Sequence, residues 1–135
     1  MKKVFTVTLI AFILAGCTDK KAQKQAALDD VIKIHDKVMA ADEHLMKNKM
    51  QLDSLLKLPN FPAKDTAVLL RSNLDIADSA MENWMHKFDP DYKAKSDDET
   101  LTYFTSQKKQ IAAIDSELNR TITASDKYLQ KLKTK

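Results

Sequence analysis

Residues 63–88, AKDTAVLLRSNLDIADSAMENWMHKF, decide the fold of this chain. Apolar residues recur through the stretch at alternating intervals of four and three positions, without an exception. This spacing brings all of them to one side of a helix and is typical of helices that pack as in a coiled coil. The stretch therefore predicts a helix over residues 63–88, and its stripe consists of Ala63, Ala67, Leu70, Leu74, Ala77, Met81, Trp84 and Phe88.

Prolines separate this helix from a longer apolar pattern before it. Pro59 and Pro62 both disfavour helical geometry at the residue that precedes them, so a turn is expected between two helices. Residues 19–58 form the first helix in this interpretation. Its apolar positions follow intervals of three, four and seven residues, as a helical stripe requires; they are Leu28, Val31, Val38, Leu45, Leu52 and Leu55.

A third helix is expected after the next break in the pattern, which contains Pro90. Ser96-Asp97-Asp98-Glu99 matches a capping box, in which the serine caps the helix and Glu99 reaches back to it. The helix then continues over residues 97–133. Its stripe is Leu101, Phe104, Ile111, Leu118, Ile122, Leu129 and Leu132.

Polar residues interrupt two of the three stripes. His35, Asp42 and Lys49 recur every seven residues in the first helix, and the third helix carries Lys108, Asp115 and Ser125 within its stripe. Such residues lie at the edge of a helix contact or form polar layers inside it. The sequence leaves both placements open.

Three helices with short connections predict an all-α fold, an up-down-up antiparallel three-helix bundle with coiled-coil-like packing. Counting outward from the two turns places Trp84 level with Asp36 on the first helix and with Tyr103 on the third. One chemically distinctive cluster should therefore form, for packing in the core or for interaction with a partner. Its expected members are His35, Met39, Met81, Trp84, Met85, Phe88, Tyr103 and Phe104.

The composition excludes several classes of function. Gly16 is the only glycine in the 135 residues, so the chain after it has no phosphate-binding loop, dinucleotide fingerprint or glycine-flanked nucleophile elbow. We therefore expect no catalytic residues and no enzyme. Without residues 1–16 the net charge falls from +3 to +1, and such a balance argues against nucleic acid as a partner.

The first residues have the order of an export signal. Lys2 and Lys3 precede a largely apolar run over residues 4–14, which is too short to span a bilayer. Leu14-Ala15-Gly16-Cys17 then resembles the lipobox of bacterial lipoproteins. The resemblance implies that residues 1–16 are a signal peptide, that Cys17 carries palmitate or similar acyl chains, and that residues 17–135 form a lipid-anchored domain. We expect this covalent lipid to be the only prosthetic group.

The lipobox also implies an address in the cell envelope. In lipoproteins of this kind the residue after the cysteine influences sorting, and Thr18 favours the outer membrane, facing the periplasm, over retention in the inner membrane. The lipid anchor makes the membrane one partner of the chain. The other expected partner is an envelope protein that the sequence does not name.

Two further segments resemble a family of small Bacteroidetes lipoproteins often labelled "viral A-type inclusion protein". They are His35-Asp36-Lys37-Val38-Met39 and Met81-Glu82-Asn83-Trp84-Met85-His86-Lys87-Phe88. The family carries a His-Asp-x-Val-Met segment followed by a Met-x-x-Trp-Met-x-x-Phe segment. The label reflects coiled-coil similarity, and the resemblance implies no activity.

Three functions remain open from the sequence. The first is a non-enzymatic, lipid-anchored bundle that acts through protein–protein contact or as a structural element. The second is a periplasmic lipoprotein that binds or senses a copper-type metal, because thioether and imidazole groups suit copper(I); its candidate ligands are His35, Met39, Met81, Met85 and His86. We expect no metal there, since methionines also fill irregular cores and no fixed ligand spacing is present. The third is an envelope-stress chaperone, which an exposed apolar face would mark.

Overall fold

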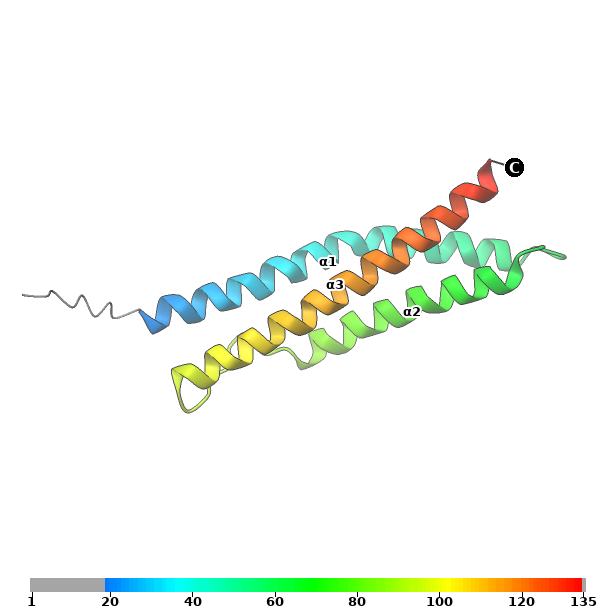
Figure 1. Ribbon diagram of the computed structural model, residues 1–135. Coiled ribbons are helices and arrows are strands. Elements are labelled where there is room, and N and C mark those ends of the chain that lie inside the picture. Colours follow the sequence, from blue (N-terminus) through cyan, green and yellow to red (C-terminus); the bar gives the residue numbers. More distant parts are fainter. Residues whose placement is uncertain (1–18, 135) are drawn as a thin grey trace, which may run out of the picture.

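The chain folds as three long helices, with no strand within residues 19–134, which the computed structural model describes. Helix α1 spans Lys20–Leu56, α2 spans Lys64–Lys87 and α3 spans Asp97–Lys133. Figure 1 shows them side by side along most of their length. The all-α prediction is confirmed. Residues 1–16, the predicted signal peptide, and the predicted lipid site Cys17 lie outside the described residues.

The helix ends differ from the predicted ends by two residues at most. Helix α1 ends at Leu56 rather than at residue 58, because Lys57 forms its C-cap and Pro59 follows closely. The connection that follows contains Asn60 with a φ of 60°, a left-handed conformation that asparagine tolerates better than most residues. Helix α3 begins with the predicted capping box, in which Ser96 Oγ accepts from the Glu99 N–H and Glu99 accepts from the Ser96 N–H.

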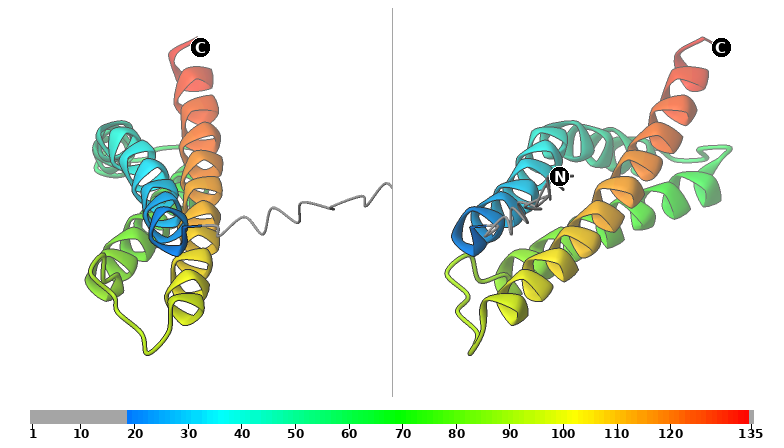
Figure 2. Two further views of the ribbon diagram at one scale, coloured as in Figure 1. Left: turned by 90° about the vertical axis from the view of Figure 1, so that its left-hand side faces the viewer. Right: turned by 60° about the vertical axis from the view of Figure 1, so that its left-hand side comes forward.

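The topology is up-down-up. Helix α2 runs antiparallel to its two neighbours, so α1 and α3 are parallel, and each helix packs against the other two (Figures 1 and 2). Helix α1 places a core residue every seventh position: Val31, Val38, Leu45 and Leu52 are almost inaccessible to solvent. This heptad spacing confirms the coiled-coil-like packing. The other helices complete the core with Ala67, Leu74, Ala77, Met81, Trp84, Ile111, Leu118, Ile122 and Leu129.

Three of the ion pairs between α1 and α3 have the same separation in sequence. Lys20–Asp98, Asp30–Lys108 and Lys37–Asp115 each join residues 78 positions apart, at 2.7, 2.7 and 2.6 Å. Two of the polar residues that interrupt the α3 stripe are thus partners of α1. Surface pairs of this kind each contribute about 1 kcal/mol or less. They accompany the alignment that the packed core sets, and the apolar core provides most of the stability.

A buried polar layer ties all three helices together, level with the middle of α2 and with the second halves of α1 and α3. The consecutive residues Asn48 and Lys49 are only 2% and 9% exposed, and they point to different helices. Asn48 Nδ2 donates to Ser125 Oγ of α3 at 2.9 Å. Lys49 Nζ lies 2.8 Å from Asp75 and 2.7 Å from Asp78 of α2. Lys49 therefore belongs to a polar layer, one of the two placements that the sequence left open.

In this layer, hydrogen bonds to oppositely charged residues determine the direction in which the pKa values of Asp75 and Lys49 shift. Hydrogen bonds from Arg71 first, and then from Lys49, hold the pKa of Asp75 below its ordinary value. Burial acts to lower the pKa of Lys49, but the hydrogen bonds to Asp75 and Asp78 outweigh it and raise that pKa overall. Arg71 also donates to Asp53 of α1 at 2.8 Å. The network remains charged at neutral pH and links α1 to α2 at two successive turns.

Candidate functional site

A row of aromatic rings lies where α2 ends and α3 begins. The Trp84 and Phe88 rings stack at a centroid distance of 4.7 Å, and Phe88 faces Tyr103 of α3 at 6.4 Å. His35 of α1 extends the row on the other side of Trp84, at 6.1 Å. The row therefore joins all three helices, and it is the cluster that the sequence placed at this level.

Six of the eight residues expected in this cluster are buried or partly buried. Met81, Trp84 and Phe104 are buried, and His35, Phe88 and Tyr103 are half-buried. Met39 and Met85 are instead exposed, by 40% and 39%, so their assignment to the core is wrong. Each directly follows a core residue, and one helical step turns a side chain by about 100° away from the core.

The connection between α2 and α3 adds a ring that helical periodicity did not reveal. Tyr92 stacks on Tyr103 with their centroids 3.9 Å apart. The hydroxyl of Tyr103 accepts a hydrogen bond of 2.8 Å from the backbone N–H of Asp89. Tyr103 thus holds the connection at two points. Tyr92 has no helical stripe to mark it, and only the number of aromatic residues around Pro90 hinted at this contact.

Replacing Tyr103 by phenylalanine is expected to destabilise the bundle by about 0.5–1.5 kcal/mol, because the Asp89 N–H loses its acceptor while the stacked ring remains. Urea denaturation followed by circular dichroism measures this change. Tyr128→Phe is the matched control, since Tyr128 donates to the carbonyl of Ala63 at the opposite end. Tyr103→Phe should speed backbone hydrogen exchange only in the 88–96 connection, and Tyr128→Phe should not speed it there. Unchanged exchange in this connection in Tyr103→Phe would contradict the assigned contact.

The five candidate metal ligands do not form one site. The Nδ1 atom of His35 is 2.9 Å from the carboxylate of Asp36. His86 is two positions after Trp84, which places it on the opposite side of α2 and exposed. Met81 lies in the core while Met39 and Met85 face solvent. Within residues 19–134, no group of three or more histidine, cysteine, aspartate or glutamate side chains is arranged to hold a metal ion.

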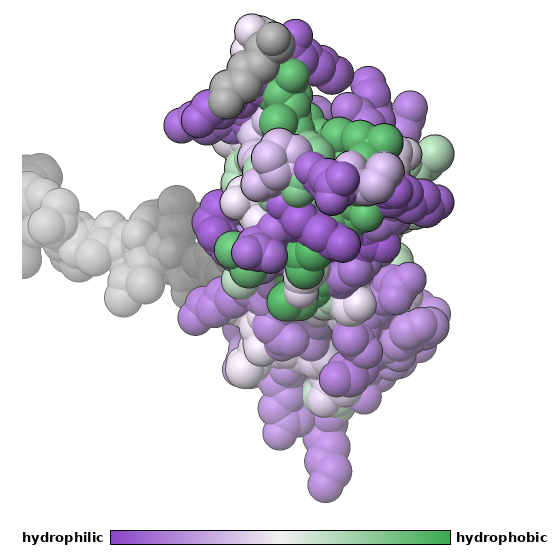
Figure 3. Space-filling view, turned by 90° about the vertical axis from the view of Figure 1, so that its right-hand side faces the viewer, coloured by the Kyte–Doolittle hydropathy of each residue, from purple (hydrophilic) through white to green (hydrophobic). Residues whose placement is uncertain are grey.

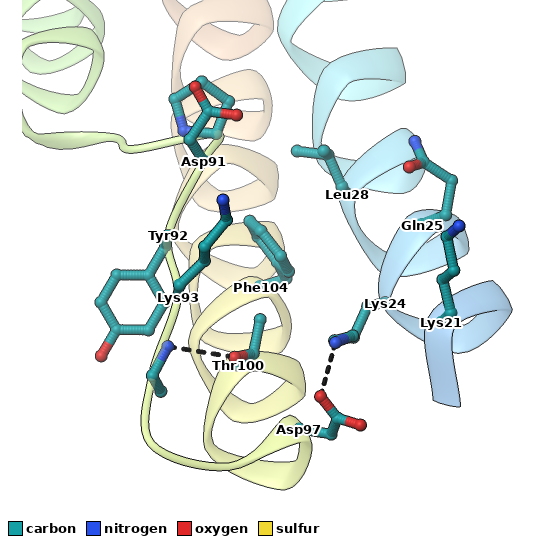
Figure 4. Close-up of a pocket in the computed structure, with 12 residues that line it drawn as sticks. Lys21, Lys24, Gln25, Leu28, Asp91, Tyr92, Lys93, Asp97, Thr100 and Phe104 are labelled. Atoms are coloured by element: carbon teal, nitrogen blue, oxygen red, sulfur yellow. Dashed lines mark hydrogen bonds and ion pairs between the residues drawn. The ribbon is translucent and has the colours of Figure 1, made fainter. Parts of the chain in front are cut away.

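A shallow pocket of about 350 Å³ lies beside the aromatic row, between the first turns of α1 and α3 (Figure 4). Lys24 Nζ and Asp97 pair at 2.5 Å at its edge, and Thr100 accepts from the N–H of Ala94 at 3.2 Å. Leu28 and Phe104 contribute its apolar wall. Lys24, Asp97 and Thr100 are thus already paired within the lining, and the bond to Ala94 holds the connection against α3. The lining contains no histidine or cysteine to act as base or nucleophile.

A second depression, of about 540 Å³, opens at the opposite end of the bundle. Its lining comes from the last turns of α1 and α3 and is mostly leucine and methionine. The sequence did not indicate this groove, because Leu55, Leu129 and Leu132 belong to the apolar stripes of the two helices and their spacing is that of core residues.

None of the described helices is both long and apolar enough to cross a membrane. Comparison of the chain with known protein families, with curated proteins and with solved structures found no match.

Proposed function

We propose that this chain is a lipid-anchored helical bundle of the cell envelope, held by Cys17 in the outer membrane and facing the periplasm, which binds another envelope protein and catalyses no reaction. The lipobox-like segment at residues 14–17 supports the anchor. Helix α1 begins at Lys20, three residues after Cys17. A bundle that starts so close to its anchor is held near the membrane at that end.

The observation that carries the binding role is the number of large apolar side chains on the outside of α1 and α2. Ile32, Met39 and Met46 are exposed and follow one another every seven residues, so they form one stripe along α1. Leu69 and Ile76 of α2 are each 61% exposed and are also seven residues apart. Contiguous apolar surface on a soluble domain is characteristic of protein interaction sites.

The charged groups support a non-enzymatic role. The partly buried charged groups whose pKa values hydrogen bonding shifts, those of Lys49, Arg71 and Asp75, belong to residues that pair between α1 and α2. Catalytic groups have shifted pKa values inside a pocket that admits substrate. None of these three residues lines the pocket beside the aromatic row or the groove at the other end.

Replacing Cys17 by serine is expected to abolish incorporation of labelled palmitate, because serine lacks the thiol that accepts the acyl chain. Metabolic labelling followed by immunoprecipitation measures this, and membrane fractionation shows whether the protein leaves the outer membrane. Thr18→Ser is the control and should label normally. Palmitate found on the Cys17→Ser protein would contradict the lipid anchor.

Site-specific photo-crosslinking in cells tests the binding role. A photo-reactive residue at Met46 or Ile76 should give one discrete adduct of reproducible mass. The same residue at Lys109, on the polar surface of α3, should give none. Adducts of equal yield from all three positions would argue against a defined partner.

The exposed stripes also favour a second candidate, a chaperone that holds unfolded clients. Such a protein should suppress aggregation of a heat-denatured model protein in proportion to its concentration. Replacing Leu69 and Ile76 together by serine should remove the effect. A specific binding partner without any suppression of aggregation would exclude this candidate.

A further inference from the structure

The groove at the end of the bundle away from residue 19 forms where α3 diverges from its neighbours (Figures 1 and 2). Tyr128 of α3 donates to the carbonyl of Ala63, just before α2 begins, at 3.0 Å. Beyond this contact the last residues of α3 extend past the beginning of α2. Met50, Leu55 and Leu58 form one wall of the groove, and Leu129 and Leu132 form the other.

No residue of α2 is among those lining the groove, so it lies on the side of the α1–α3 contact that α2 leaves uncovered. Met50 and Leu58 are 67% and 52% exposed. In a view onto the end of the bundle that lies on the right in Figure 1, apolar side chains lie together below the end of α3, and hydrophilic side chains surround them (Figure 3). The diverging ends of α1 and α3 thus leave room for a further helix to pack against both.

The charge around the groove is positive. Lys133 is part of the lining, and Lys47 and Lys57 lie one helical turn from Met50 and Ser54. Across residues 19–134, the recorded ion pairs involve none of these three lysines. The carboxylate of Asp126, one turn before Leu129, is already bound by His44 and Asn48. The groove thus combines apolar walls with lysines free to bind anions.

We infer that this groove binds an acidic amphipathic helix of the envelope partner, with its leucine-like side chains between α1 and α3 and its carboxylates on Lys47, Lys57 and Lys133. The inference rests on the proposed function and specifies the chemistry of its partner. Helices that dock into apolar grooves do so through residues three and four positions apart, which matches the spacing of Met50, Ser54 and Leu58 along the wall.

Charge and position favour this occupant over two others. A second copy docking end to end would bring the lysines of two chains together, including Lys64, Lys127 and Lys131 at the same end, and like charges oppose such contact. The groove begins about 45 Å along α1 from Lys20, at about 1.5 Å per residue. With an anchor at Cys17, it projects away from the lipid surface that holds the chain.

Methyl spectra of the protein with ¹³C-labelled methionine test the inference, because Met50 lines the groove whereas Met39, Met81 and Met85 do not. The probe is a synthetic helix of about five turns with leucine on one face and glutamate on the other. The Met50 signal should shift on titration while those of Met39 and Met85 stay in place. The same peptide with lysine in place of glutamate should leave all the methionine signals unchanged.

Affinity of the labelled peptide measures the contribution of single residues. Met50→Glu and Lys133→Glu should each weaken binding at least about tenfold, since a few central residues carry most of the energy of such contacts. Val68→Glu and Lys109→Glu, exposed controls outside the lining of the groove, should bind as the unaltered chain does. Circular dichroism should show equal helicity for all four variants, because each replaced side chain faces solvent.

Three results would overturn the inference. They are an unshifted Met50 signal with the acidic peptide, equal binding of both peptides, and a Met50 shift produced by phosphatidylglycerol vesicles or by raising the protein concentration alone. Absence of palmitate from the unaltered chain would contradict the anchor and leave the peptide response intact. A missing peptide response with normal labelling and normal crosslinking would contradict only the groove.

Discussion

Replacing Trp84 by alanine is expected to lower the free energy of unfolding by about 3–5 kcal/mol, the usual cost of truncating a buried aromatic residue. Trp84 is 5% exposed and contacts rings from α1 and α2. A domain of this size has a total stability of about 5–15 kcal/mol. The variant should therefore be partly unfolded at moderate temperature, as urea denaturation monitored by circular dichroism would show.

Trp84→Phe is the informative control. The indole Nε1 of Trp84 is buried and has no hydrogen-bond partner among the described residues, and an unsatisfied buried donor costs about 1–3 kcal/mol. Phenylalanine removes that donor and keeps a stacked ring, so its effect should be much smaller than that of alanine. Because Trp84 is the only tryptophan, blue-shifted emission that iodide quenches poorly should accompany the folded state. Emission like that of indole in water would contradict its burial.

Replacing Lys49 by alanine is expected to cost about 2–3 kcal/mol, because Asp75 and Asp78 lose their shared cation inside the contact between α1 and α2. The two carboxylates are themselves partly exposed, which keeps the cost below that of a fully buried pair. Lys47→Ala, two positions away on the exposed surface of α1, should change the stability by less than about 0.5 kcal/mol. Equal losses in the two variants would argue against the buried layer.

The Lys49→Ala variant should also show a changed dependence of stability on pH. Asp75 has a lowered pKa in the folded chain, so its contribution is complete above its ordinary value of 3.8 and is lost as the pH falls through the lower folded value. Lys49 has a raised pKa, so its contribution is complete below 10.5 and is lost as the pH rises through the higher folded value. Lys49→Ala should therefore flatten the decline of stability at both extremes. Unfolding midpoints measured across this range provide the test.

Sequence reasoning located the helices and the aromatic cluster because both depend on local spacing. The apolar stripe of residues 63–88 needs only the helical period to place Met81, Trp84 and Phe88 on one side. Sequence reasoning failed to place Met39 and Met85. Each is next to a core position, and a side chain at the edge of a stripe can face either the core or the solvent. Sequence reasoning also missed Tyr92, whose position depends on the path of a connection without periodicity.

The groove could not be predicted from the sequence, for a related reason. Leu129 and Leu132 belong to the same stripe as the buried residues Ile111 and Leu118, and nothing in the spacing distinguishes them. Leu129 is nevertheless buried while Leu132 is partly exposed, and this difference follows from the angle at which α3 leaves α1. That angle is a property of the whole helix contact.

The sequence by itself determined the three helices, their order, the capping box at Ser96 and the apolar side that each helix turns inward, because these depend on residues within a few positions of one another. Only the tertiary structure decided which polar residues pair. Asn48 and Lys49 are neighbours in the chain, yet one bonds Ser125 and the other Asp75 and Asp78. Partners 78 positions apart, such as Lys37 and Asp115, meet only when the packed core sets the rotation and alignment of both helices. That alignment is a sum over all the contacts of the core, and no local pattern contains it.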